Sequence, residues 1–164
     1  MAGRPLPSSP PPDRSPLVSA VVAFLADPAA PPIAALPVAA AVAAELRVAL
    51  PAQGYLVREL RGSRMRTVPA LFDEFAAAWQ FPYYFGGNKD AFDECLRDLD
   101  EWVGPAAGYV VVLRDAAELL ADVPAERAWF DAAMADAAAY WSVRDVAFRL
   151  LRLGPPAGYP VLAG

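Results

Sequence analysis

The chain has 164 residues, enough for one ordinary domain with a sizeable core and too few for two domains of typical size. It carries 14 Lys and Arg against 19 Asp and Glu, a net charge of -5, which argues against nucleic-acid binding through phosphate neutralisation. There is no histidine, so His-dependent catalytic triads and His metal ligands are excluded. The single cysteine, Cys95, excludes an intramolecular disulfide and indicates a reducing compartment, so we expect a cytoplasmic protein.

The most apolar stretch, residues 28–44, does not predict a membrane anchor. A transmembrane helix needs about 20 continuous apolar residues. Here Pro31, Pro32 and Pro37 interrupt the stretch. We therefore expect no contact with a membrane.

Composition divides the chain into three segments. Residues 1–15 are rich in Pro and Ser with almost no large apolar side chain, which predicts a disordered tail. Residues 16–52 are rich in Ala and Pro, and their apolar spacing predicts a helical extension that either packs on the main domain or docks on a partner. Residues 53–164 carry the regular patterns of the main domain.

In the main domain, the patterns predict strands that alternate with helices. The strand expected at residues 109–113 is apolar throughout, which is typical of a strand buried on both faces. Because helical crossovers separate the strands, we expect an α/β fold with a small three-stranded parallel sheet, packed with about four helices. The expected strands are 55–60, 109–113 and 146–153, and the expected helices are 68–81, 89–103, 115–121 and 124–141.

The helix expected at residues 89–103 has two contrasting faces. At 3.6 residues per turn, one face is an apolar stripe of the kind that packs into a core. The other face is acidic, and Asp90 and Glu94 hold two like charges one turn apart, which costs a helix a few tenths of a kcal/mol. The apolar face consists of Phe92, Cys95, Leu96, Leu99, Trp102 and Val103, and the acidic face of Asp90, Asp93, Glu94, Asp98, Asp100 and Glu101.

An aromatic loop, residues 81–87, directly precedes this helix. A solvated face is the ordinary interpretation of an acidic helix, but residues 81–85 place four large aromatic residues around Pro82. Gly86 and Gly87 then allow a tight turn into the helix, which Asn88 can cap. Aromatic side chains exposed beside carboxylates have the composition of a protein–protein hot spot.

The run from Phe81 to Asp98 resembles the signature of the barstar family, which are inhibitors of barnase-type ribonucleases. The shared pattern is a Pro, a Tyr pair, Gly, Asn, an Asp-Ala step, an acidic residue and a Leu. The order of strands and helices extends the resemblance from Gly54 to Gly158. It implies a barstar-like fold for residues 53–164 and a non-catalytic inhibitor, an antitoxin or immunity protein, that blocks the basic active site of a barnase-like ribonuclease.

The resemblance also implies which residues bind the partner. Tyr84 matches the family tyrosine that packs against the ribonuclease, and Asp90 matches the acid before the Ala of the Asp-Ala step. Glu94 takes the place of the central aspartate, whose carboxylate enters the ribonuclease active site. Arg97 and Trp102 lie at or near two further contact positions. A pocket of Arg, Lys and His that holds a phosphate can also hold a carboxylate. The barnase–barstar pair is the reference example of electrostatic steering and of interface hot spots, and the mechanism expected here is taken from that pair.

The chain departs from the family pattern at two partner-binding positions. Asp93 stands where a tryptophan often stands, and Glu94 is one methylene longer than aspartate. Both departures bear on partner choice. The family also uses acids from its fourth helix, for which Asp131 and Asp136 are the available residues.

Two other functions compete with inhibition. A protein-binding or regulatory module could keep the barstar fold and recognise a partner that is not a ribonuclease. An enzyme with paired carboxylates, as in glycoside hydrolysis, is disfavoured because the acids lie on one exposed helix and do not converge on a cleft. Residues 98–101 lack the glycine and the ligand spacing of a calcium loop, and we expect no cofactor, metal or catalytic residue.

Two further features have structural interpretations. Cys95 lies on the apolar face, so we expect a buried structural thiol and not a nucleophile. The only basic cluster consists of four arginines around the first strand, and we expect them to solvate that strand and its turn because no aromatic stacking platform accompanies them. They are Arg58, Arg61, Arg64 and Arg66.

Overall fold

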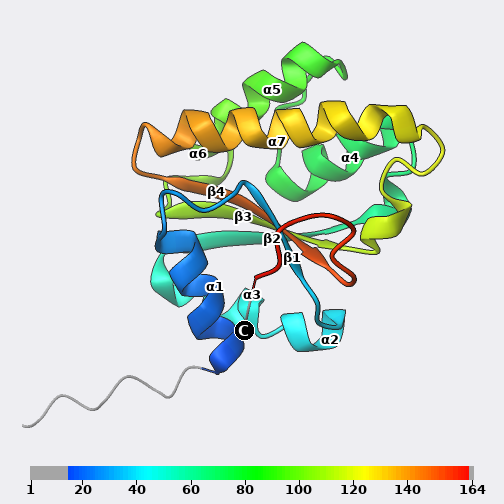
Figure 1. Cartoon of the computed structure of the whole chain (residues 1–164). Helices are drawn as coiled ribbons and strands as arrows, with labels where there is room; N and C mark the ends of the chain where they lie inside the picture. Colours follow the sequence, from blue (N-terminus) through cyan, green and yellow to red (C-terminus); the bar gives the residue numbers. More distant parts are fainter. Residues whose placement is uncertain (1–14, 163–164) are drawn as a thin grey trace, which may run out of the picture.

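The computed structural model describes residues 15–162 and has a sheet of parallel strands as its middle layer (Figure 1). The sheet has four strands in the order β1-β4-β3-β2. All three pairings are parallel, which confirms the predicted α/β class. The strands are β1 (Ile33–Leu36), β2 (Tyr55–Arg61), β3 (Gly108–Arg114) and β4 (Ala147–Leu153).

Helices cover both faces of the sheet (Figure 1). One face carries α4 (Val68–Trp79), α5 (Lys89–Arg97), α6 (Leu99–Val103) and α7 (Arg127–Ser142). The other face carries α1 (Pro16–Ala26), α2 (Ala40–Ala43) and α3 (Leu46–Ala49). Single turns of 3-10 helix are η1 (Pro51–Gln53), η2 (Gly62–Arg64), η3 (Ala116–Glu118) and η4 (Pro124–Glu126).

Alternate residues of the central strands point into two separate cores. On β3, Val111 and Leu113 join the core beneath α4 to α7, whereas Val110 and Val112 join the core beneath α1 to α3. This alternation is the period-2 geometry of a strand. Six consecutive residues of β3 are buried, as its unbroken apolar run predicts.

The prediction of three strands is wrong, because residues 33–36 form a fourth. β1 pairs with β4 in parallel register from Ile33 opposite Leu150 to Leu36 opposite Leu153. All four residues of β1 are buried. Prolines flank this strand, and two of its four residues are alanine, so its sequence lacks the signature of a strand. The segment before the main domain is therefore not a helical extension alone; it holds α1, a strand, and the short α2 and α3.

Two expected helices are shorter than the sequence predicts. The helix expected at 89–103 divides at Asp98, where φ of -114° and ψ of 23° separate α5 from α6. The helix expected at 115–121 is only the 3-10 turn η3. By contrast, α4 begins as predicted, because the Thr67 hydroxyl accepts a hydrogen bond from the Ala70 amide at 3.3 Å. Residues 1–14, where a disordered tail is expected, lie outside the described residues.

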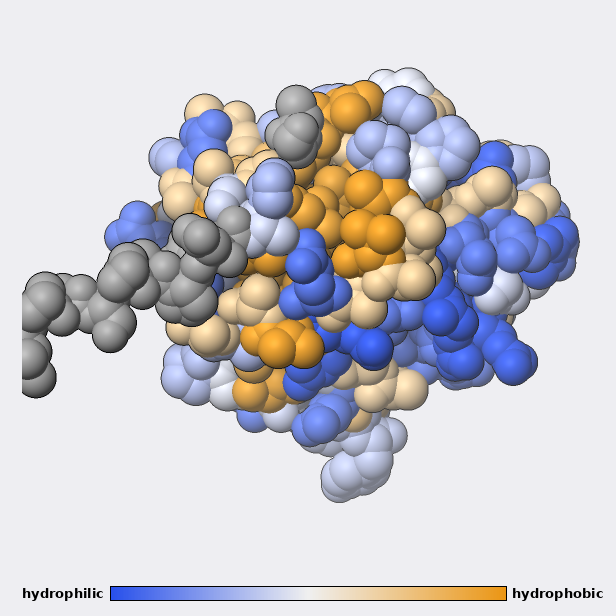
Figure 2. Space-filling model, turned by 90° about the horizontal axis from the view of Figure 1, so that it is seen from below, coloured by the Kyte–Doolittle hydropathy of each residue, from blue (hydrophilic) through white to orange (hydrophobic). Residues whose placement is uncertain are grey.

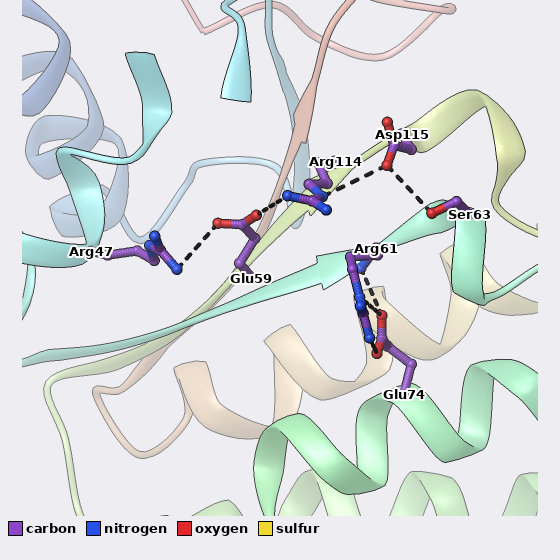
Figure 3. Close-up of polar contacts among 7 residues, drawn as sticks. All are labelled: Arg47, Glu59, Arg61, Ser63, Glu74, Arg114 and Asp115. Carbon is purple, nitrogen blue, oxygen red and sulfur yellow. Dashed lines mark hydrogen bonds and ion pairs between the residues drawn. The ribbon is translucent and has the colours of Figure 1, made fainter. Parts of the chain in front are cut away.

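Polar contacts tie the N-terminal segment to the edge of the sheet (Figure 3). Arg47 on α3 lies 3.6 Å from Glu59 on β2, measured from nitrogen to oxygen. Glu59 also accepts a hydrogen bond of 3.1 Å from Arg114 on β3. Further along β2, the Arg61 guanidinium donates two bonds, of 2.9 and 3.0 Å, to Glu74 on α4. Charged side chains thus occupy the edge strand β2, which discourages pairing with another chain.

The N-terminal segment also leaves apolar side chains on the surface. Figure 2 shows hydrophobic residues gathered on the face that lies below in Figure 1, where α1, α2 and α3 are found. Val42 on α2 is 53% exposed and Val48 on α3 is 80% exposed. Among residues 15–162, no helix is both long and apolar enough to cross a membrane.

The N-terminal segment is expected to contribute to the stability of the whole sheet. Leu46 on α3 is fully buried, so Leu46→Ala should lower the free energy of unfolding by about 3 kcal/mol. Val48→Ala, on the same helix and at the surface, should change it by less than about 0.5 kcal/mol. Urea denaturation followed by circular dichroism measures both. If Leu46→Ala changed the free energy of unfolding as little as Val48→Ala, the segment would not stabilise the sheet.

Candidate functional site

The N-cap and the apolar stripe of α5 orient its acidic face outwards. The Asn88 side chain accepts a hydrogen bond of 2.8 Å from the Ala91 amide, as the sequence predicts. Gly87, directly before the cap, has φ of +64°, a conformation that favours glycine. Phe92 and Leu96 are buried in the core, so Asp90 and Glu94, on the opposite side of the helix, point to solvent.

Lys89 joins the start of α5 to η4. Its ammonium donates a hydrogen bond of 2.7 Å to Glu126 and lies 4.9 Å from the centre of the Trp129 ring. The only lysine of the chain is therefore engaged away from the acidic face. It does not neutralise the carboxylates of α5.

The aromatic loop divides between core and surface. Phe81 and Phe85 are half-buried and pack edge to face on each other, with ring centres 5.3 Å apart. Tyr83 and Tyr84 are exposed, by 100% and 66% of their surfaces. The loop thus places two tyrosines in solvent beside the start of α5.

The break between α5 and α6 places Trp102 against Tyr84. The Trp102 indole donates a hydrogen bond of 3.2 Å to the Cys95 carbonyl, which also accepts from the Asp98 amide at the end of α5. Its ring lies edge to face with Tyr84, with centres 6.3 Å apart. Tyr83 packs in the same way on Tyr84, at 5.5 Å. We call Tyr83, Tyr84 and Trp102 the aromatic patch.

Most carboxylates of α5 and α6 have no cationic partner in the part of the chain that the structure describes. Within residues 15–162, no ion pair involves the exposed Asp90 or Glu94, which lie one turn apart on α5. The same is true of three acids at the end of α5 and on α6: Asp98, Asp100 and Glu101. Unpaired charges of one sign make a field that attracts a basic partner.

Asp93 points to a different place, a cavity of about 260 Å³ between α5 and α7. Arg97 and Asp136 line the same cavity. Burial raises the pKa of Asp93, Arg97 opposes that shift, and the charges of Asp136 and Asp90 add to it. One carboxylate oxygen of Asp93, Oδ1, is buried and has no hydrogen-bond partner within the described residues. An acid held in this way is available to a donor from another molecule.

In the structure, the residues predicted from the sequence to bind a partner form two groups. Tyr84 and Trp102 touch, beside the helix that exposes Asp90 and Glu94. Asp93 and Arg97 face α7 across the cavity. Sequence reasoning did not place Tyr83 in the first group or Asp136 in the second. The resemblance names Asp136 as an available acid of the fourth helix, but only the packing of α7 on α5 shows that it faces Asp93 and Arg97.

The other notable residues have structural roles. Cys95 is buried, and burial raises its pKa to about 11, so a nucleophilic thiolate is disfavoured. Arg61 is paired with Glu74. Arg66 forms ion pairs with Glu118 and Asp122, and Arg58 donates to a carbonyl of α4. Residues 15–162 contain no group of three or more Cys, Asp or Glu placed to hold a metal ion.

The position of Asp93 predicts a pH-dependent loss of stability. The pKa of Asp93 is higher in the folded than in the unfolded chain, so the folded state binds more protons at pH values between the two. The stability of the fold therefore falls as the pH rises from the unfolded-state pKa through the folded-state pKa. Asp93→Asn should therefore raise the free energy of unfolding at pH 7.5, and the gain should shrink towards pH 4. Asp90→Asn, in the first turn of α5, should instead lower it by about 0.5 kcal/mol through the helix dipole.

Urea titrations of the three proteins at the two pH values test this. A gain for Asp93→Asn that is the same at pH 4 and pH 7.5 would contradict the assignment of the effect to the Asp93 charge.

Comparison with known proteins identifies the family. No curated protein sequence matches the chain. The family model described as Barstar (barnase inhibitor) matches residues 55–152, which run from the start of β2 almost to the end of β4 and include α5 and the aromatic patch. The match spans more than half of the 164 residues. The chain therefore belongs to the barstar family.

Proposed function

We propose that this chain inhibits a barnase-type ribonuclease by placing the acidic face of α5 against the basic active site of that enzyme. The observation that carries the proposal is that two exposed carboxylates, Asp90 and Glu94, have no cationic partner among residues 15–162 and lie beside exposed aromatic rings. Exposed aromatic anchors beside charges are typical of interface hot spots. The family match, which covers these residues, supports a ribonuclease as the partner.

The inhibitor acts by occupying the substrate site and performs no chemistry. Glu94 is assigned the central role, with its carboxylate accepting hydrogen bonds from the basic groups that otherwise hold a phosphate. Asp90, one turn earlier, is assigned a second cationic partner. Tyr84 is assigned a packing role, with its ring supported from behind by Trp102.

Asp93 and Arg97 are assigned to the rim of the interface. Asp93 Oδ1, which has no hydrogen-bond partner among residues 15–162, can accept from a basic side chain that enters the cavity between α5 and α7. Arg97 is exposed on the same side of α5 and can meet an acidic residue outside the active site of the partner. A rim with charges of both signs favours one docking orientation over others.

Glu94→Ala should weaken inhibition of a barnase-type ribonuclease by roughly 30-fold or more, which corresponds to about 2 kcal/mol for a hot-spot residue. Asp90→Ala should weaken it in the same direction. The matched control is Asp73→Ala, which removes the same charge from an exposed position on α4. The inhibition constant of each variant is measured together with its thermal unfolding. Unchanged inhibition by folded Glu94→Ala and Asp90→Ala would remove α5 from the interface.

The proposed mode of association also predicts a strong effect of salt. Because unpaired charges attract the partner over distance, the association rate should fall steeply as salt rises, whereas the dissociation rate should change much less. Stopped-flow measurements between 50 mM and 500 mM NaCl test this. An association rate independent of salt would contradict electrostatic steering by the acidic face.

A second candidate is a barstar-fold module that binds a partner other than a ribonuclease. It is favoured by the acids at two contact positions, Asp93 in place of a frequent tryptophan and Glu94 in place of aspartate. Capture of a non-nuclease protein that requires Glu94, with no inhibition of ribonucleases by the wild-type chain, would support this candidate over the first.

A further inference from the structure

A second cavity lies at the end of the sheet where the strands begin, on the face that carries α1. Its volume is about 350 Å³, within the range of small-molecule sites. The end of α1, the start of β2, and the segment that leads from α7 into β4 form its walls. Since α5 packs on the opposite face of the sheet, this cavity is separate from the proposed ribonuclease interface (Figure 1).

Arg149 on β4 lines this cavity and is the one buried charged residue within the described part of the chain. It is only 4% exposed. Its Nη1 donates to the Phe148 carbonyl at 2.8 Å, and its Nη2 donates to the Asp27 carbonyl at 3.3 Å. Its Nε is buried and has no acceptor within residues 15–162. Two of the five N–H groups of the guanidinium thus have acceptors, and both acceptors are uncharged.

A buried guanidinium without an anionic partner is costly to the fold. Within residues 15–162, no carboxylate lies within ion-pair distance of Arg149. Burial lowers its pKa, and the charge of Asp27 only partly opposes this. A bound anion would supply the missing charge and accept from the unused N–H groups.

The walls of the cavity select the kind of anion. Leu25, Pro28 and Val146 are apolar, and the Tyr55 ring adds a flat surface. Tyr55 can lie there because Gly108 has no side chain; a Cβ at that position would be 2.8 Å from the ring. Two acids, Asp27 beside Arg149 and Asp145 in the wall, disfavour a ligand with two negative charges.

We propose that this cavity binds a small organic monocarboxylate. Its carboxylate accepts hydrogen bonds from Arg149, and its apolar part packs against Leu25, Pro28 and Tyr55. Leu25 and Pro28 precede the family match, which starts at residue 55, whereas Arg149 lies within it. The ligand would therefore contact both the N-terminal segment and the region that the family model matches. Its binding is independent of the proposed ribonuclease inhibition.

Calorimetric titration with benzoate tests the proposal. Wild-type protein should bind benzoate at one site with a dissociation constant on the order of 1 mM or below. Benzamide, which has nearly the same shape without the charge, and inorganic phosphate, which carries more charge, should each bind at least tenfold more weakly. Bound benzoate should also raise the unfolding temperature in proportion to its saturation.

Variants locate the site. Arg149→Met should abolish benzoate binding, whereas Arg152→Met should not, because Arg152, on the same strand, instead lies over the Tyr159 ring. Should Arg149→Met fail to fold, Ala107→Leu keeps the arginine and narrows the cavity from an exposed lining position, and it should weaken binding at least tenfold. Absence of saturable benzoate binding, equal binding by folded Arg149→Met, or tighter binding of phosphate than of benzoate would overturn the proposal.

Discussion

The fold depends on covering both faces of one parallel sheet. The central strands β3 and β4 are buried on both faces, and a parallel sheet left bare on one side would expose that surface to water. The region matched by the barstar family model supplies α4 to α7 for one face. The N-terminal segment supplies α1 to α3 for the other and adds β1 at the edge next to β4. In this chain the segment is part of the core.

The same constraint determines where the proposed interface lies. Because α5 commits Phe92, Cys95 and Leu96 to the core, the acids Asp90 and Glu94 on its other side face solvent. The break at Asp98 then turns α6 so that Trp102 returns to the end of α5 and supports Tyr84. The acidic face and the aromatic patch therefore lie on helices that pack into one core, and a surface preorganised in this way loses less entropy when a partner binds.

Charge is distributed unevenly over the molecule. Arginines around β2 are engaged, as Arg61 is by Glu74 and Arg114 by Glu59, whereas Asp90 and Glu94 have no cationic partner in the described chain. Asp93 departs furthest from the family pattern and is also the acid whose burial raises its pKa. A side-chain pKa shifted by its surroundings is more typical of a functional site than of a residue that stabilises the fold. The unpaired charges and the raised pKa of Asp93 both support the proposal that α5 is a binding surface.

The sequence by itself determined the elements that local chemistry controls. The caps at Thr67 and Asn88, the apolar run of β3 and the two-faced pattern of α5 are all legible in neighbouring residues, and so is the family signature around Asp90. Only the tertiary structure decided the rest. β1 is a strand because β4 offers it an open edge, and the cavity of Asp93 exists because α7 carries Asp136 to α5. Such contacts join residues far apart along the chain, so no local pattern encodes them.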